Sequence, residues 1–323
     1  MDARPGNRNQ CMDFIKGIAC VCVVFMHCEF PGQLGIVVQA ASRFCVPFFF
    51  MVSGFYCYRN DADKIRKKTL HILRITAGAS LFYVLFALLQ YACGVKDIFR
   101  FSLLDIGVFA VFNAPVVIVS QIWFLYALLY DYFLFYLAVR TGKVKWAQRM
   151  IPALALLYIL FAQGAVLLGI HIPKVLYKNF LVEGFTFFML GHWLHENRNK
   201  VEKIGNPVLY AVIAGSTLLC VAERYFMGRD FGVNIFSFPQ VFCIFVYAMN
   251  NPSAHSGGCF QKLGARCSMF VYILHPFVWH SLEYAYRWAG VQENVFALYP
   301  LPLLVLSMSI SLSILLTARK KEA

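Results

Sequence analysis

Apolar runs of about twenty residues recur along almost the whole chain of 323 residues. A helix needs roughly 20 apolar residues to cross the hydrocarbon core of a bilayer. Hydrophobic residues make up 60% of the chain and charged residues only 14%, whereas soluble domains are about half apolar and about a quarter charged. The pattern predicts an all-α, polytopic integral membrane protein.

About ten membrane-spanning helices are expected, at residues 13–29, 34–57, 72–93, 119–139, 150–170, 179–196, 207–224, 234–250, 267–284 and 296–317. The stretch 101–118 is also apolar, but Asn113 and Pro115 interrupt it. It fits an extra span, a re-entrant loop or an interfacial segment. Because no segment has the composition of a soluble domain, residues 1–323 are expected to form a single transmembrane domain.

Basic residues divide unevenly between the loops on the two sides. With the N-terminus inside, about 21 of the 29 Lys and Arg residues fall on the cytoplasmic side, as the positive-inside rule requires. This predicts a multi-pass cell-membrane protein, surrounded by lipid, with both termini cytoplasmic. The net charge of +13 does not indicate nucleic-acid binding, because the charges are spread over short loops.

The eleven cysteines lie mostly inside apolar runs and form no CxxC pair. Zinc binding and a disulfide scaffold are therefore not expected, and no metal is predicted. The chain also has no GxxxxGK[ST] or GxGxxG loop, so nothing indicates nucleotide hydrolysis.

The first span carries three ionisable residues, Asp13, Lys16 and His27. Charge in hydrocarbon is costly, so such residues are functional candidates. Lys16 and His27 are eleven residues apart; they share one helix face and lie roughly 16 Å apart along the axis. His27 can take a proton from a hydroxyl at neutral pH. The structural alternative is a helix-end histidine bonded to a carbonyl.

Lys16 also has more than one interpretation. It would snorkel as a topology anchor, pair with Asp13, or meet the anionic end of a cytoplasmic donor. The segment from Arg59 to Arg74 carries six basic residues. It would bind anionic headgroups or a phosphate-bearing cofactor such as coenzyme A.

The second span contains Arg43, Pro47, Ser53 and Gly54. Structurally it is expected to be a packing helix kinked at Pro47, with close helix approach at Ser53-Gly54. Functionally, Arg43 would bind a substrate or a developing anion, because an unpaired intramembrane arginine is rare.

Later spans supply further candidates. Trp123 is most simply an interfacial anchor, and Asp131 and Glu183 are candidate buried charges. Pro276 frees the carbonyl four residues earlier, and His275 would occupy the resulting polar pocket. Four other residues are expected at the interfaces: His192, His195, His280 and Glu283.

These residues together resemble the membrane acyltransferase-3 family. A basic residue, ten intervening residues and a histidine, here Lys16 to His27, form the signature of its first helix; many members have Arg where this chain has Lys. The segment Pro47–Phe55 is similar to the family's PxFFxxSGF, and Trp123–Leu125 to its WFL. The stretch Asn179–Gly184 is similar to RN-x-L-x-x-G, with Lys178 in place of Arg. Tyr272–Pro276 is similar to YxxHP.

The resemblance implies an O-acyltransferase that moves an acyl group, commonly acetyl, from cytoplasmic acyl-CoA to a hydroxyl of a cell-surface glycan. It implies that His27 is catalytic and that Lys16 contacts the donor. The resemblance also implies that Arg43 is catalytic together with His27. Ser53 and Arg74 are assigned to donor binding. Trp123, Glu183 and His275 are assigned to substrate binding. A transporter of a small solute or polysaccharide intermediate is the alternative, since broken, charged helices suit it too. The oligomeric state is not determined by the sequence.

Overall fold

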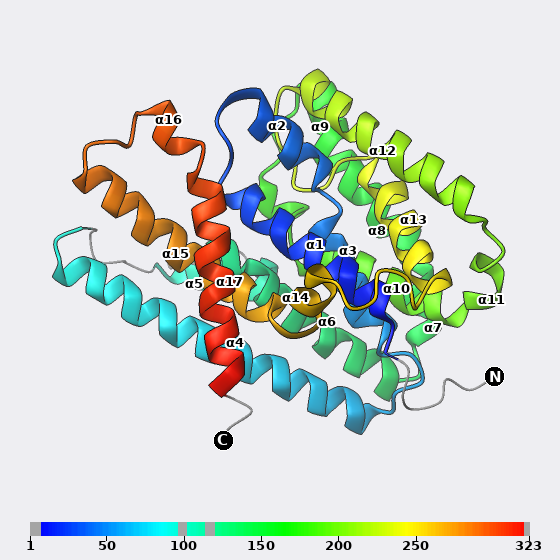
Figure 1. The fold of residues 1–323 in the computed structure, drawn as a ribbon. Coiled ribbons are helices and arrows are strands. Elements are labelled where there is room, and N and C mark those ends of the chain that lie inside the picture. Colours follow the sequence, from blue (N-terminus) through cyan, green and yellow to red (C-terminus); the bar gives the residue numbers. More distant parts are fainter. Residues whose placement is uncertain (1–7, 96–101, 114–119, 320–323) are drawn as a thin grey trace. The chain divides into compact units, whose positions relative to one another are not determined.

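The structure is a computed structural model that describes residues 8–95, 102–113 and 120–319, and every regular element in these ranges is helical. Figure 1 shows these helices along the chain. By its internal contacts the chain divides into two compact units. The terminal unit combines Met1–Phe49 with Asn197–Ala323, and the central unit is Phe50–Glu196. The division falls inside one helix, α3 (Cys45–Phe55).

The terminal unit contains the first helices and the last third of the chain. Its main helices are α1 (Gln10–His27), α2 (Gly32–Ala41), α12 (Asn206–Met227), α13 (Ser237–Asn250), α14 (Cys259–Arg266), α15 (Ser268–Trp288) and α17 (Leu301–Arg319), with short turns α11 (Arg198–Val201) and α16 (Val295–Leu298). The side chain of Asn9 caps α1 by accepting from the amide of Met12 at 2.7 Å. Pro207 lies in the first turn of α12, and Gly228 follows the helix in the left-handed conformation.

The central unit contains α4 (Ala62–Ala92), α5 (Leu103–Phe112), α6 (Trp123–Arg140), α7 (Val144–Arg149), α8 (Ile151–Ile159), α9 (Ala165–Leu167) and α10 (Thr186–Glu196). Two π-helical turns interrupt it, η2 (Leu160–Gly164) and η4 (Phe180–Phe185), besides the short 3₁₀ turns η1 (Ser120–Ile122) and η3 (Lys174–Leu176). Such π-turns often occur at functional sites.

Within the described residues, six helical segments are long and apolar enough to cross a bilayer: Gln10–His27, Gly32–Phe55, Ala62–Ala92, Val144–Leu167, Asn206–Met227 and Val295–Ala318. The chain is thus a polytopic helical membrane protein. The other four expected spans coincide with helices that are not among these six segments, namely α6, α10, α13 and α15. The count of ten crossings and the placement of both termini in the cytoplasm stay predictions.

Three local expectations need revision. The second span does not kink at Pro47; it turns at residues 42–44, and Pro47 is the third residue of α3, where the first turn of a helix tolerates proline. The basic segment after Arg59 is not a loop, since Asp61 caps α4 and the segment is helical from Ala62. In the stretch 101–118, α5 spans ten residues, about 15 Å, which is too short to cross. Pro115 lies outside the described residues.

A pair of glycines allows two helix backbones to touch in each unit. In the terminal unit, a β-carbon at Gly17 would lie 2.0 Å from the carbonyl oxygen of Phe260, and one at Gly264 would lie 1.9 Å from that of Asp13. In the central unit, a β-carbon at Gly54 of α3 would lie 1.8 Å from the carbonyl oxygen of Phe188, and one at Gly191 of α10 would lie 2.0 Å from that of Met51. The close approach expected at Ser53-Gly54 is confirmed.

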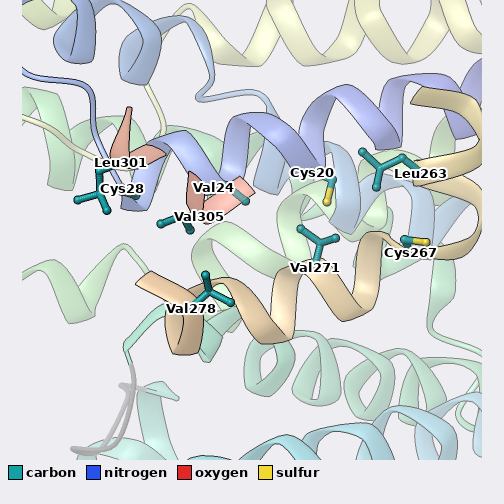
Figure 2. Packing of buried hydrophobic residues seen from close by; sticks show 9 residues of the cluster. All are labelled: Cys20, Val24, Cys28, Leu263, Cys267, Val271, Val278, Leu301 and Val305. Carbon is teal, nitrogen blue, oxygen red and sulfur yellow. The ribbon is translucent and has the colours of Figure 1, made fainter. Parts of the chain in front are cut away.

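The core of the terminal unit lies between α1, α15 and α17 (Figure 2). Cys20 of α1 and Val271 of α15 point toward one another, and Val305 of α17 closes the cluster beside Val24. These buried contacts hold the C-terminal half of α1 against α15, which positions His27 at the end of α1 and His275 within α15.

Candidate functional site

The first half of α1 carries a compact ionic cluster. Asp13 is buried, and Lys16 forms an ion pair with it at 2.6 Å. Arg8 bonds to the same carboxylate and donates to the carbonyl of Ala265 at 2.9 Å. Two cations thus share one carboxylate, which leaves the cluster net positive while Lys16 keeps 18% of its side chain exposed. Lys16 pairs with Asp13, and the positive charge in excess remains available to an anion.

His27 is the last residue of α1 and stacks on His275 of α15. The ring centroids are 5.3 Å apart and the planes differ by 26°. His275 is fully buried, whereas His27 is half-buried. The two imidazoles therefore form one pair, of which His27 is the accessible member.

The tautomer of His275 follows from its neighbours. Its Nδ1 lies 3.2 Å from the carbonyl oxygen of Val271, and the ring also interacts with the backbone of Tyr272. Pro276 cannot donate to the Tyr272 carbonyl. Because carbonyls only accept, Nδ1 carries the proton, and Nε2 of the neutral ring is an acceptor. Among the described residues no group hydrogen-bonds to this buried Nε2.

Arg43 lies at the same end of α1 as His27. It contacts the sulfur of Met26, the residue before His27, at 3.6 Å. Arg43 is buried but it is not unpaired, since it forms an ion pair with Asp230 at 2.5 Å. Asp230 lies between α12 and α13 and was not singled out by the sequence, because its role depends on a contact 187 positions away from Arg43. The arginine is thereby held at the end of α1 that carries His27.

Glu29 adds a further carboxyl to this end of the unit. It bonds to Gln39, and it lies in the segment between α1 and α2. Burial raises the pKa of Glu29; Asp230 adds to the rise, and Arg43 and Arg224 oppose it.

The other predicted site residues belong to the central unit. Ser53 interacts with the hydroxyl of Tyr132, and Arg74 is exposed on α4. Trp123 is buried rather than exposed at a surface, and the ammonium of Lys178 lies 5.2 Å from its ring centre. The structure describes this set within its own unit, separately from Lys16, His27, Arg43 and His275.

Glu183 lies in the π-turn η4 and is almost fully buried, as is Asp131 of α6. The two carboxyls interact electrostatically. A β-carbon at Gly184 would lie 2.6 Å from a carboxylate oxygen of Asp131. A larger residue at position 184 would therefore press on the Asp131 carboxyl group, which favours glycine there.

A small cavity of about 280 Å³ opens beside residues 57–60 of the central unit. Arg59, Lys145, His192 and Glu196 contribute its polar walls. Lys145 pairs with Glu196 at 2.5 Å, and Gln148 bridges Glu196 and His192. His192 was expected at the interface, but it is buried because α7 packs over it. Across the part of the chain that the structure describes, no group of three His, Cys, Asp or Glu side chains could hold a metal ion.

Residues 9–317 match the family model described as an acyltransferase domain, in the acyltransferase-3 family. The chain belongs to the acyltransferase-3 family. It is therefore a membrane acyltransferase, and the match favours this class over a transporter. The search of curated proteins and the search of solved structures gave no match.

Proposed function

We propose that this acyltransferase moves an acetyl group from cytoplasmic acetyl-CoA to a hydroxyl of a cell-surface glycan, and that His27 is the catalytic base. The observation that carries the proposal is the stacked pair of His27 and His275. A base must reach the acceptor and keep a lone pair at neutral pH. His27 is the accessible member of the pair, and its position at the histidine of the first-helix signature supports this assignment.

In the proposed reaction, a ring nitrogen of His27 removes the proton of the acceptor hydroxyl while its oxygen attacks the thioester carbonyl. The C–S bond then breaks, the thiolate of coenzyme A takes the proton from His27, and the ester remains on the acceptor. Positive charge grows on His27 in the transition state. The face of the neutral His275 ring lies against it and favours that charge.

Arg43 is proposed to stabilise the oxyanion that forms on the carbonyl oxygen of the thioester during attack. Its charge is held at the His27 end of α1 by Asp230 and by the contact with Met26. A donor fixed before the reaction begins is worth more than one that must reorganise. The ion pair therefore positions Arg43 without requiring the substrate to order it.

The donor's phosphates are proposed to bind at the cytoplasmic end of α1, where Arg8 and Lys16 carry net positive charge beside Asp13. Arg74, on the exposed basic turns of α4, and Ser53 are proposed to contribute to donor binding. Trp123, Glu183 and His275 are proposed to contact the substrate, and the protein is proposed to act in the cell membrane.

The test uses the full chain in lipid vesicles with acetyl-CoA labelled in its acetyl group. We expect His27→Ala to lose roughly 10²–10⁴-fold in rate while it inserts and purifies normally. His280→Ala is the matched control. His280 lies on α15, five residues after His275, and bonds to Glu283; its removal should leave the rate unchanged. Full activity of His27→Ala would exclude the assignment.

Two mass measurements complete the test. Mass spectrometry of cell-surface glycans, with and without the chain, should show one acetyl group gained per modified acceptor. The purified protein incubated with acetyl-CoA but no acceptor should keep its own mass. A stable acetyl group on His27 would instead indicate a covalent route.

A further inference from the structure

An apolar groove of about 670 Å³ runs along the terminal unit beside α17. Leu306, Ile310 and Ile314 line it from α17, and Leu263 and Cys267 form its floor. The last two also belong to the core between α1 and α15, as Figure 2 shows. The floor of the groove is therefore rigid, while its opening along α17 is exposed.

The length of the groove matches one leaflet of a bilayer. Its lining on α17 extends from Leu306 to Ala318, about 18 Å along the helix axis at roughly 1.5 Å per residue. Half of a hydrocarbon core of about 30 Å is roughly 15 Å. A single extended acyl chain would thus fill the groove from the headgroup level to the midplane.

Two cations lie at one end of the groove. Lys262 and Arg266 are one helical turn apart on α14, and both line it. The opposite face of α14 packs Gly264 on the backbone of α1, so the basic side chains face away from that contact. Among the described residues neither cation forms an ion pair. In the orientation that the basic loops predict, this end lies at the cytoplasmic surface.

We propose that this groove binds one acyl chain of an anionic phospholipid from the cytoplasmic leaflet, with the lipid phosphate held by Lys262 and Arg266. The apolar lining fits the chain, and the two cations at its end fit the charge of the headgroup. A bound lipid would cover Leu263 and stabilise the packing of α14 on α1. The proposal is independent of acyl transfer, because its readouts are lipid retention and thermal stability.

The experiment uses the full chain purified in detergent with added phosphatidylglycerol or phosphatidylcholine. We expect phosphatidylglycerol to bind about tenfold more tightly or better, to remain bound in native mass spectrometry, and to raise Tm by mass action. The double variant Lys262→Gln with Arg266→Gln should bind the two lipids equally. The control, Lys200→Gln with Lys203→Gln, removes the same charge elsewhere in the unit and should retain the preference.

A second variant pair tests the groove itself. Ile314→Trp should fill it and abolish the rise in Tm, whereas Leu315→Trp, at the adjacent exposed position outside the groove lining, should keep it. A phosphatidylglycerol with a photoreactive acyl chain needs no variant at all. It should label residues 301–319 of the wild-type protein in preference to the exposed helix α12.

Equal affinity of the wild type for both lipids would overturn the proposal, as would an undiminished rise in Tm for Ile314→Trp. Photolabelling of α12 in preference to α17 would place the lipid elsewhere and would also overturn it.

Discussion

The two units bury charge in opposite ways. In the terminal unit, buried Arg43 faces Asp230 and buried Asp13 faces Lys16, so each charge has an opposite partner. In the central unit, buried Asp131 and Glu183 lie near each other with like charge. Ionising both carboxyls together would be costly. The terminal unit therefore holds its buried charges as fixed ion pairs. In the central unit, the environment of the two carboxyls favours their neutral, protonated form.

The units share one device, the glycine pair at a helix crossing, and breaking it should have the largest effect on stability. Gly264→Ala and Gly191→Ala place a methyl group about 2 Å from a backbone oxygen of the adjacent helix. Overpacking against a backbone that cannot move aside costs about 3 kcal/mol or more. We expect either variant to lower Tm sharply or to fail to fold.

The matched controls are Gly215→Ala in α12 and Gly78→Ala in α4, where a β-carbon meets nothing within 4 Å. Alanine suits a helix better than glycine does, so these should be neutral or slightly more stable. The measurement is the Tm of the four variants, determined by thermal unfolding in the same detergent. Equal Tm values for all four would show that the crossings are looser than described.

Neutralising one acid in each unit sharpens the contrast directly. Asp230→Asn leaves the buried Arg43 without its counter-charge, which should cost about 3 kcal/mol. Asp131→Asn keeps the shape and replaces one member of a pair whose joint ionisation is costly, so its cost should be below about 1 kcal/mol. Unfolding free energies of the two variants decide the matter. A cost as large for Asp131→Asn as for Asp230→Asn would mean that the central carboxyl has a cationic partner.

The smallest effect is expected from replacing Pro276, the proline inside α15 that donates no helical hydrogen bond to Tyr272 and lies next to His275. Pro276→Ala restores an amide for the Tyr272 carbonyl, which then bonds along the helix and no longer to His275. Tm should stay the same or rise, while the acyl-transfer rate should fall by about tenfold or less because the histidine pair is less well oriented. An unchanged rate would show that the Tyr272 carbonyl does not orient His275.

The sequence by itself determined the helical membrane architecture and the family. Apolar runs of membrane length leave little choice of fold, because backbone groups in lipid must be bonded within their own helix. The face shared by Lys16 and His27 was also predictable, since it depends only on the helical repeat. The same holds for the carbonyl freed by Pro276, which is a property of proline alone.

Only the tertiary structure decided which residues meet. The pairing of Arg43 with Asp230 and the stacking of His27 on His275 join positions nearly two hundred residues apart or more, and no local periodicity encodes such contacts. The turn at residues 42–44 precedes Pro47 and contains Arg43, which is buried against Met26, a contact that likewise exists only in the folded structure. Propensity and hydropathy act within a helix, whereas the partner of a buried charge is chosen by how the helices pack.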